Sequence, residues 1–429
     1  MNRIQNLITT GPKLAIHGGV PTIEGALPAD STIGEAEFNA VRRVFDRGSL
    51  SGFYGSWGDE FLGGVEVKDF EKAWAQQFNM PHAISVNSAT SGLYAAMGAL
   101  GISPGDEVIV SPYTMSASVM APLIYGAIPV FVDIEPETFC LDVEKVAQAI
   151  TNRTKAIITV NLFGHPAKLH ELAALAKAKG IYLVEDNAQG PLATEYGQYA
   201  GTIGDIGVFS LNYHKHIHTG EGGVCVTSNS ELALRLQAIR NHAENIVEPA
   251  PIVDPVNMIG YNYRMTEMSA AVGISQLASV EMQVSRRQQL AEALSAGLAD
   301  LEGVTVPVVR PNCRHVYYVW SARLDERVLG VSREKFSRAL AAEGFPHFVG
   351  YVRPLYLLPT FQRRIAIGRD GWPFTMTDRK YEKGMCPVAE RMHEYELLCF
   401  ETCAYRVNDE LIQRLIGAFC KVHENRHSI

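Results

Sequence analysis

Short apolar runs recur along the middle of the chain, and none of them alternates strictly between apolar and polar residues. This pattern is typical of strands that are covered on both faces of a sheet, rather than strands with one face in water. Polar and glycine-containing segments separate the runs. The expected strands are residues 83–87, 107–111, 128–133, 156–161, 181–185, 207–211 and 223–227.

Between these runs, apolar residues recur at helical spacing in residues 91–100, 143–150 and 169–178. Gly180 follows the last of these segments, as expected where a helix ends. Alternating strands and helices predict a mostly parallel sheet with helices on both faces. We therefore expect an α/β fold around a seven-stranded sheet, with one antiparallel strand near the end of the series.

The pattern changes after about residue 277, where a long helical stretch covers residues 280–298. Residues 304–309 and 317–324 follow as strands, and residues 349–373, rich in Pro, Tyr and Gly, are expected to be irregular. A length of 429 residues also exceeds what one core usually organises. We expect a large domain of residues 1–278, with residues 1–30 as an N-terminal segment, and a smaller α+β domain of residues 279–429.

Composition and charge exclude several classes of protein. A net charge of -8 argues against a dedicated nucleic-acid binder. The most apolar stretch, residues 119–132, is too short to span a membrane and contains Pro122 and Pro129. Residues 1–12 do not resemble a secretory signal, and the seven cysteines form no CxxC pair. We expect a soluble, cytoplasmic protein with no membrane or nucleic-acid partner.

Candidate chemistry lies at the ends of strands, where ligands bind in open α/β sheets. Ser88, Ala89 and Thr90 open a helix, where free backbone N–H groups can hold a phosphate. An ordinary N-cap would use the same residue types. Asp186 follows an apolar strand, and a buried carboxylate there needs a partner such as a protonated pyridine nitrogen. A capping or salt-bridged aspartate is the alternative.

Lys215 lies in a polar, aromatic and histidine-rich loop between two expected strands, just before a Gly-Glu-Gly-Gly run. A lysine that is desolvated or close to other cations loses its proton more readily, and its neutral amine can form an imine with an aldehyde. His214, His216 and His218 would share one face of an extended segment and suggest a metal site. No carboxylate or cysteine completes such a site, so no metal is expected.

Together, the anion cradle, the aspartate and the lysine suit one cofactor. They follow the expected strands in the order Ser88, Asp186 and Lys215, with the lysine 29 residues (215 minus 186) after the aspartate. Pyridoxal phosphate needs a phosphate anchor, a partner for its ring nitrogen and a lysine. The sequence therefore predicts a pyridoxal phosphate site at one edge of the sheet.

With these residues in this order, the chain resembles the DegT/StrS-like sugar aminotransferases, which have fold type I, the aspartate-aminotransferase-like fold. The resemblance covers residues from about Leu14 to about Val422. Its markers, besides Glu185-Asp186 and Ser210 with Lys215, are Leu14–Gly19 (LAIHGG), Pro104–Ile109 (PGDEVI), Thr154–Ile158 (TKAII), Gly220–Gly223 (GEGG) and Gly260–Thr266 (GYNYRMT).

The resemblance implies roles for the site residues. Lys215 forms the Schiff base and moves the proton, while Asp186 pairs with the pyridine nitrogen and Gln189 lies near the cofactor hydroxyl. A homodimer with composite active sites is implied, because Asn262 or Arg264 reaches the phosphate in the neighbouring subunit. Met115 replaces an aromatic residue that stacks on the cofactor in many relatives. The residues implied at the phosphate of the chain's own cofactor are Ser88, Ala89, Thr90 and Ser210.

The implied activity is the transfer of an amino group from glutamate or glutamine, through pyridoxamine phosphate, to a keto group. The acceptor is a nucleotide-linked keto sugar, a scyllo-inosose-type cyclitol or a keto sugar acid. Arg353 is the candidate for the donor carboxylate, and the loop of residues 49–57 lines either the substrate or a subunit interface. The candidate substrate residues are Tyr54, Trp57, His216, His315, Tyr351 and Arg353.

Two other functions remain open at this point. Some relatives carry His at the lysine position and remove a hydroxyl group, which makes a sugar dehydratase one alternative. Lys215 favours transamination over that reaction. A non-catalytic sensor with the same fold is the other alternative, although a sensor would have no physical requirement for the lysine.

Overall fold

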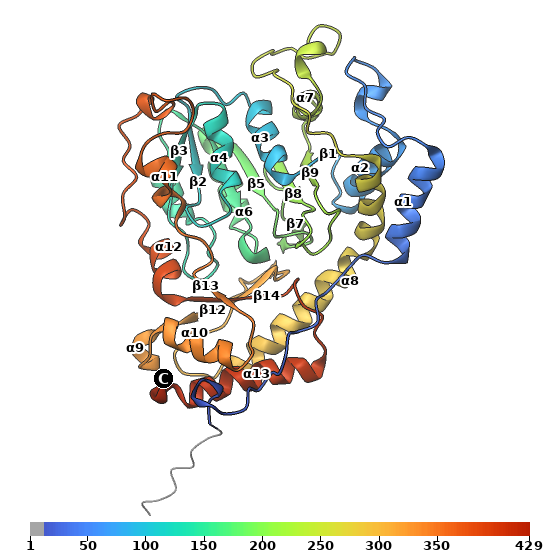
Figure 1. Cartoon of the computed structure of the whole chain (residues 1–429). Helices are drawn as coiled ribbons and strands as arrows, with labels where there is room; N and C mark the ends of the chain where they lie inside the picture. Colours follow the sequence, from blue (N-terminus) through green and yellow to red (C-terminus); the bar gives the residue numbers. More distant parts are fainter. Residues whose placement is uncertain (1–12) are drawn as a thin grey trace, which may run out of the picture.

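The computed structural model describes residues 13–429, and its largest element is a seven-stranded sheet (Figure 1). The expectation that residues 1–12 hold no secretory signal concerns a part of the chain outside that range. The strand order is β1-β9-β8-β5-β4-β2-β3. The strands are β1 His82–Val86, β2 Glu107–Val110, β3 Ile128–Phe131, β4 Thr154–Val160, β5 Tyr182–Asp186, β8 Ile206–Ser210 and β9 Gly223–Thr227.

The direction of the strands follows the sequence-based expectation. β9 pairs antiparallel with both β8 and β1. The pairs β2–β3, β2–β4, β4–β5 and β5–β8 are parallel. Each strand begins within two residues of its expected start. The predicted α/β fold, with one antiparallel strand late in the series, is therefore confirmed.

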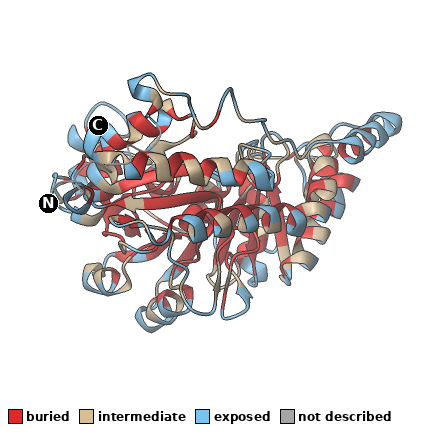
Figure 2. Ribbon diagram, turned by 90° about the horizontal axis from the view of Figure 1, so that it is seen from below, coloured by how far each residue is buried: buried red, intermediate tan, exposed pale blue. Residues whose placement is uncertain are grey.

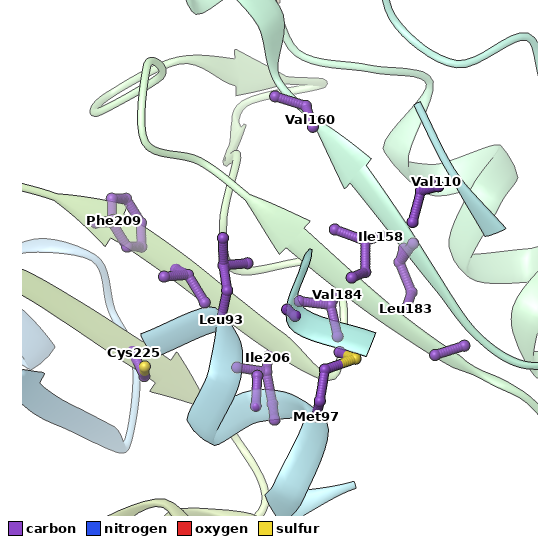
Figure 3. Packing of buried hydrophobic residues seen from close by; sticks show 14 of the residues in the cluster. Leu93, Met97, Val110, Ile158, Val160, Leu183, Val184, Ile206, Phe209 and Cys225 are labelled. Atoms are coloured by element: carbon purple, nitrogen blue, oxygen red, sulfur yellow. The ribbon is translucent and has the colours of Figure 1, made fainter. Parts of the chain in front are cut away.

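Helices pack around this sheet and complete its core. Leu93 and Met97 of α3 lie against strand residues that include Val184 and Ile206 (Figure 3). The expected helix end at Gly180 is confirmed, since this residue adopts the left-handed conformation (φ 64°). The helices of this part are α1 Glu35–Arg47, α2 Val65–Gln77, α3 Ala89–Ala99, α4 Ala117–Ile124, α5 Val143–Ala149, α6 Leu169–Lys179 and α7 Ser230–Arg240.

The long helix α8 spans Glu267–Leu298, so the expected start at residue 280 was wrong. Thr266 caps the helix, because its side chain accepts a hydrogen bond from the Ser269 N–H. The first turns bury residues such as Ala270, Ala271 and Gly273, whose small side chains give little apolar periodicity. α8 contacts α1 and α2 and also α13 (Asp409–Glu424), so one unbroken helix runs through the expected domain boundary at residue 278.

A four-stranded antiparallel sheet, in the order β10-β12-β14-β13, forms the centre of the second part. It has its own hydrophobic cluster, which includes Trp320, Phe336 and Phe400. The elements after α8 are β10 Val304–Thr305, β11 Cys313–Arg314, β12 Val319–Leu324, α9 Glu326–Leu329, α10 Arg333–Ala342, β13 Phe348–Val349, α11 Pro359–Gln362, α12 Pro387–Arg391, β14 Leu397–Glu401 and α13.

Two segments pack away from their neighbours in the sequence. Leu14 and Ile23 belong to the hydrophobic cluster of the second part, and the start of the described chain lies beside α13 (Figure 1). The segment after β13 returns to the large sheet, where the Leu355 N–H donates to the Pro112 carbonyl (2.8 Å) and Phe361 is buried. The division into residues 1–278 and 279–429 stays a prediction.

Burial follows the layered arrangement of the fold. The central strands are buried along their length, and the helices around them bury one side and expose the other (Figure 2). All residues of β2, β3 and β9 are buried, including the polar residues Glu107 at the start of β2 and Thr227 at the end of β9. Among residues 13–429, no helix has both the length and the apolar character to cross a bilayer.

Candidate active site

Asp186 is the last residue of β5, and its side chain is buried at the carboxyl end of the sheet. The Ser118 hydroxyl, in the first turn of α4, donates to its Oδ2 atom (2.6 Å), and the Ala188 N–H donates to Oδ1 (3.1 Å). Burial raises the pKa of Asp186, whereas these hydrogen bonds and the charge of Lys215 oppose the rise. The carboxylate has no salt-bridge partner within 4 Å among the described residues.

Lys215 lies in the turn after β8, the strand adjacent to β5. Its Nζ atom lies 4.1 Å from the centroid of the Tyr318 ring. Burial lowers the pKa of Lys215 to about 8, although the nearby charge of Asp186 favours the ammonium form. Roughly a tenth of an amine with such a pKa is neutral at pH 7. The site therefore pairs a buried carboxylate with an amine that readily becomes a nucleophile.

Gln189 connects this pair to the second part of the chain. Its side-chain oxygen accepts from the Phe163 N–H (2.7 Å), and its amide nitrogen donates to the Tyr351 hydroxyl (3.0 Å). The Tyr351 ring meets Phe163 edge-on, with ring centroids 4.9 Å apart. Tyr351, which the sequence suggested as a substrate residue, thus lies in the same wall as Gln189.

Ser88, Ala89 and Thr90 lie where β1 leads into α3. The Ser88 hydroxyl accepts a hydrogen bond from the Ser91 N–H (3.0 Å) and acts as the N-cap of α3. This is the role that the sequence suggested as the alternative to phosphate binding. The N–H groups of Ala89 and Thr90 form no hydrogen bond within residues 13–429 and stay available to an anion.

Neighbouring strand ends bring the rest of the expected phosphate region to this helix. Gly223 at the start of β9 pairs with both Ser210 and Val86. A Cβ atom on Gly223 would lie 2.6 Å from the Ala89 nitrogen, so only glycine allows this close approach. Ser210 pairs with Gly223, and Gly223 lies against Ala89, so only β9 separates Ser210 from the start of α3.

Asn262 and Arg264 lie beside the same helix end of their own chain. The Asn87 N–H donates to the Tyr263 carbonyl (2.8 Å), and the Asn87 amide donates to the Asn262 carbonyl (3.2 Å). Arg264 is half-buried and donates to the side-chain oxygens of Asn262 (2.9 Å) and Asn241 (3.0 Å). Asn262 is exposed. Contact with the cofactor of a neighbouring subunit stays a prediction for both residues.

The histidines near Lys215 differ in their surroundings. The loop is a turn in which His214 is exposed and His216 is buried, so the expectation that they share one face was wrong. His216 donates from Nε2 to the Val316 carbonyl (2.8 Å), and burial lowers its pKa to about 3. Within residues 13–429, no group of three or more His, Cys, Asp or Glu side chains is placed to hold a metal ion.

His315 is also buried and stacks on the Tyr317 ring, with ring centroids 3.8 Å apart. Burial holds the pKa of His315 well below its usual range. The burial of His216 and His315 favours a packing role for both, and contact with a substrate stays a prediction.

The remaining predicted residues lie at the surface. Met115 is 61% exposed, and Tyr54 is 63% exposed. The Tyr54 carbonyl accepts from the Asn241 side chain (2.8 Å), which places this loop near Arg264. Trp57 packs on Phe61, with ring centroids 5.7 Å apart. Arg353 is exposed and forms no hydrogen bond or salt bridge with the described residues of the site.

These residues fit pyridoxal phosphate. Free N–H groups at the start of α3 suit the phosphate, and Asp186 is a buried carboxylate in need of a cation, which a protonated ring nitrogen would supply. Sequence reasoning missed Ser118 and Tyr318, which contact Asp186 and Lys215. The tyrosine pair at residues 317–318 was visible in the sequence, but its distance from Lys215 along the chain hid the contact.

Comparisons with known proteins agree with this geometry. Residues 55–397 match the DegT/DnrJ/EryC1/StrS aminotransferase family. An L-glutamine:2-deoxy-scyllo-inosose aminotransferase from Streptoalloteichus tenebrarius is 33% identical over 95% of this chain and 97% of its own length. A GDP-perosamine synthase from Caulobacter vibrioides is 35% identical over 69% of this chain and 78% of its own length.

The fold is shared with solved aminotransferase structures. The X-ray structure of the aminotransferase from Psychrobacter cryohalolentis superposes with a TM-score of 0.81 at 28% identity. The match covers 94% of this chain and 100% of that one. The similarity thus extends over both parts of the fold.

Proposed function

The chain belongs to the DegT/DnrJ/EryC1/StrS aminotransferase family, and on that basis we propose that it moves an amino group from L-glutamine to the ketone of a scyllo-inosose-type cyclitol. The family implies pyridoxal phosphate as the cofactor. One observation carries the proposal: a buried carboxylate, Asp186, and a half-buried lysine of lowered pKa, Lys215, lie at adjacent strand ends.

The choice of acceptor rests on how far the relatives match. The inosose aminotransferase matches 95% of this chain, whereas the GDP-perosamine synthase matches 69%. A cyclitol acceptor is therefore favoured over a nucleotide-linked sugar. The same relative uses L-glutamine according to its name, which favours this donor over glutamate.

Each residue of the site has a role in this reaction. The cofactor supplies an aldehyde that bonds to the donor nitrogen and a ring that accepts electrons. Lys215 would form the imine with that aldehyde and, when released, carry the proton between donor and acceptor carbons. Asp186 would hold the ring nitrogen in its protonated state, with Ser118 and the Ala188 N–H keeping the carboxylate charged.

Gln189 and the start of α3 would hold the cofactor in place. The N–H groups of Ala89 and Thr90, with the Ser210 hydroxyl, would bind the phosphate. Gln189 is held by both Phe163 and Tyr351, so its orientation is fixed before any ligand binds. Tyr54, Trp57 and Arg353 are proposed to face the substrate, with Arg353 toward the donor carboxylate.

We also propose a homodimer in which Asn262 contributes to the cofactor phosphate of the neighbouring subunit. Arg264 donates to the Asn262 side-chain oxygen, which leaves the amide N–H groups of that exposed residue as available donors. Arg264 itself is half-buried and already engaged with Asn241. This geometry favours Asn262 over Arg264 as the residue in contact.

The proposal is tested in two half-reactions. Full-length protein is mixed with pyridoxal phosphate, and the absorbance of the imine is followed before and after addition of L-glutamine or L-glutamate. The aminated enzyme then receives a scyllo-inosose-type cyclitol or a nucleotide-linked keto sugar, and the products are identified by mass. Lys215→Ala should lose the imine band and turnover, whereas Lys155→Ala, which removes an exposed lysine on β4, should keep both.

The outcomes separate the alternatives. Conversion of the band by L-glutamine, followed by an aminated cyclitol, supports the proposal. A product that loses a hydroxyl group without gaining nitrogen would identify a dehydratase instead. A stable band that neither donor changes would favour a sensor. Full turnover in the Lys215→Ala variant would refute the role of the lysine.

A further inference from the structure

The ring of Tyr318 lies directly under the amine of Lys215. The Nζ atom is 4.1 Å from the ring centroid, well within the range of a cation–π contact. The side chains of the two residues next to Lys215 also contact this ring, with the centroids of His214 and His216 at 6.1 Å and 6.2 Å. Three consecutive residues of the catalytic loop therefore pack on one buried tyrosine.

Contacts with the four-stranded sheet of the second part hold Tyr318 in position. It immediately precedes β12, and its carbonyl accepts from the hydroxyl of Thr402 (3.2 Å), a buried residue that follows β14. Its own side chain is only 8% exposed. The ring is thus a fixed surface that the second part of the fold presents to a loop of the first.

The charges around the amine explain what such a surface can do. Burial disfavours the ammonium form of Lys215, while the carboxylates of Asp186 on β5 and Glu401 on β14 favour it. The nearby thiol of Cys403, after β14, adds no charge near pH 7, because burial raises its pKa. His214 and His216 remain neutral near pH 7: partial desolvation and the charge of Lys215 lower the pKa of His214, and full burial lowers that of His216. The electron-rich face of Tyr318 is the aromatic group in contact with the amine, and it stabilises a cation without adding a charge.

We propose that Tyr318 is a positioning residue for Lys215, whose ammonium form rests on the ring face whenever the lysine is not bonded to the cofactor. The inference rests on the proposed function, in which Lys215 is released and must hold a proton. The ring keeps the free side chain close to its working position and stabilises its protonated state. If the ring kept its shape and lost its negative face, the packing would still hold the amine in position, but the amine would hold its proton less well.

The test changes the charge distribution of the ring and leaves its shape nearly unchanged. Two full-length variants are compared with the unmodified chain: Tyr318→Phe, and a variant with trifluorophenylalanine at position 318, in which fluorine withdraws the negative charge from the ring face. The cofactor is removed, and each protein is treated with acetic anhydride between about pH 6 and 10, a range that brackets lysine titration. Mass spectrometry follows acetylation of Lys215, with exposed Lys155 as the internal reference.

The midpoint of Lys215 titration is the readout. The Tyr318→Phe variant should match the unmodified chain, because it keeps the aromatic face. The fluorinated variant should show a midpoint lower by roughly 0.4 to 1.5 pH units, with Lys155 unchanged. A midpoint in the fluorinated variant equal to or above that of Tyr318→Phe would overturn the proposal.

The failure of this inference can be told apart from failure of the proposed function. The titration uses protein without cofactor and needs no donor or acceptor. A chain that transfers no amino group from L-glutamine can still show the fluorine-dependent shift. Conversely, an active aminotransferase whose Lys215 titrates identically in both aromatic variants would lose only the role of Tyr318.

Discussion

At the scale of single residues, Asp186 illustrates how a buried charge is maintained. Burial favours the neutral acid, and only hydrogen bonds from Ser118 and Ala188, with the nearby lysine, oppose this effect. Hydrogen bonds to a charged group are worth roughly 1.5–3 kcal/mol each, enough to decide its ionisation. A cofactor ring with a protonated nitrogen would add a positive charge that favours the ionised form of Asp186.

Replacement of this residue should separate charge from shape. Asp186→Asn preserves the size of the side chain but cannot hold the ring nitrogen protonated, so turnover with L-glutamine should fall roughly a hundredfold or more. Ser118→Ala should cause a smaller loss, because the carboxylate remains. Single-turnover absorbance measurements give both rates, and an Asp186→Asn rate within a few-fold of the wild type would refute the pairing.

The pKa of Lys215 sets a pH dependence. Only the neutral amine attacks an aldehyde, and the fraction of neutral amine falls tenfold for each pH unit below the pKa. With a pKa of about 8, imine formation should accelerate up to about pH 8 and then level off. Stopped-flow mixing of the protein with pyridoxal phosphate measures this rate. A rate that still rises at pH 10 would indicate a lysine close to its ordinary value of 10.5.

At the scale of elements, the proposed phosphate region depends on the close contact of β9 and α3. Gly223→Ala would place a Cβ atom 2.6 Å from the Ala89 nitrogen and 2.7 Å from the Ser88 carbonyl carbon. Overpacking of this kind costs about 1–3 kcal/mol and should displace the first turn of α3. We expect a lower unfolding temperature and weaker binding of pyridoxal phosphate.

A glycine elsewhere provides the control for this variant. Gly417 lies within α13, and a Cβ atom there would meet its nearest neighbour, a Thr22 methyl group, at 3.8 Å. Gly417→Ala should therefore leave the protein equally or more stable. Calorimetry and a cofactor titration of both variants check the expectation, and equal cofactor affinity in Gly223→Ala would argue against this cradle.

Elements could be predicted from the sequence where local pattern decides them. The seven strands could be identified because their apolar runs have the length of strands, and the end of α6 because Gly180 adopts a conformation that glycine favours. The start of α8 was missed because the buried residues Ala270, Ala271 and Gly273 have small side chains, which form no recognisable apolar stripe in the sequence. Thr266 was the available indication, as a capping residue.

Local sequence patterns also predicted part of the candidate site, but they missed the contacts between residues far apart in the chain. Asp186 and Lys215 follow strands, so their position in the sheet could be inferred from neighbouring residues. The contacts of Lys215 with Tyr318 and of Gln189 with Tyr351 join residues more than a hundred positions apart. No periodicity along the chain encodes such pairs, because they arise from how the second part packs on the first.

At the scale of the whole molecule, the site depends on both parts of the fold. Asp186 and Lys215 belong to the large sheet, whereas Tyr318 and Tyr351 come from the chain around the smaller one. α8 contacts elements of both parts and connects them by one unbroken helix. We retain residues 1–278 and 279–429 as the proposed domains, with Leu14 and Ile23 packing on the second.

The proposed composite site makes a prediction about mixed subunits. Lys215→Ala and Asn262→Ala should each be inactive or strongly impaired alone. If Asn262 serves the neighbouring subunit, a hybrid dimer has one site with both changes and one site with neither. Random mixing of equal amounts makes half the dimers hybrids, so co-refolding should restore about a quarter of wild-type activity.

A second mixture shows whether the recovered activity has this origin. Lys215 and Asp186 lie in the same site of one chain, so mixing Lys215→Ala with Asp186→Asn leaves every site with at least one change. No recovery is expected there. Recovery in the first mixture alone would demonstrate composite sites, and an Arg264→Ala variant in place of Asn262→Ala would show which residue crosses the interface. Absence of recovery with both Asn262→Ala and Arg264→Ala would mean that these residues serve their own chain, beside Asn87, where their backbone already lies.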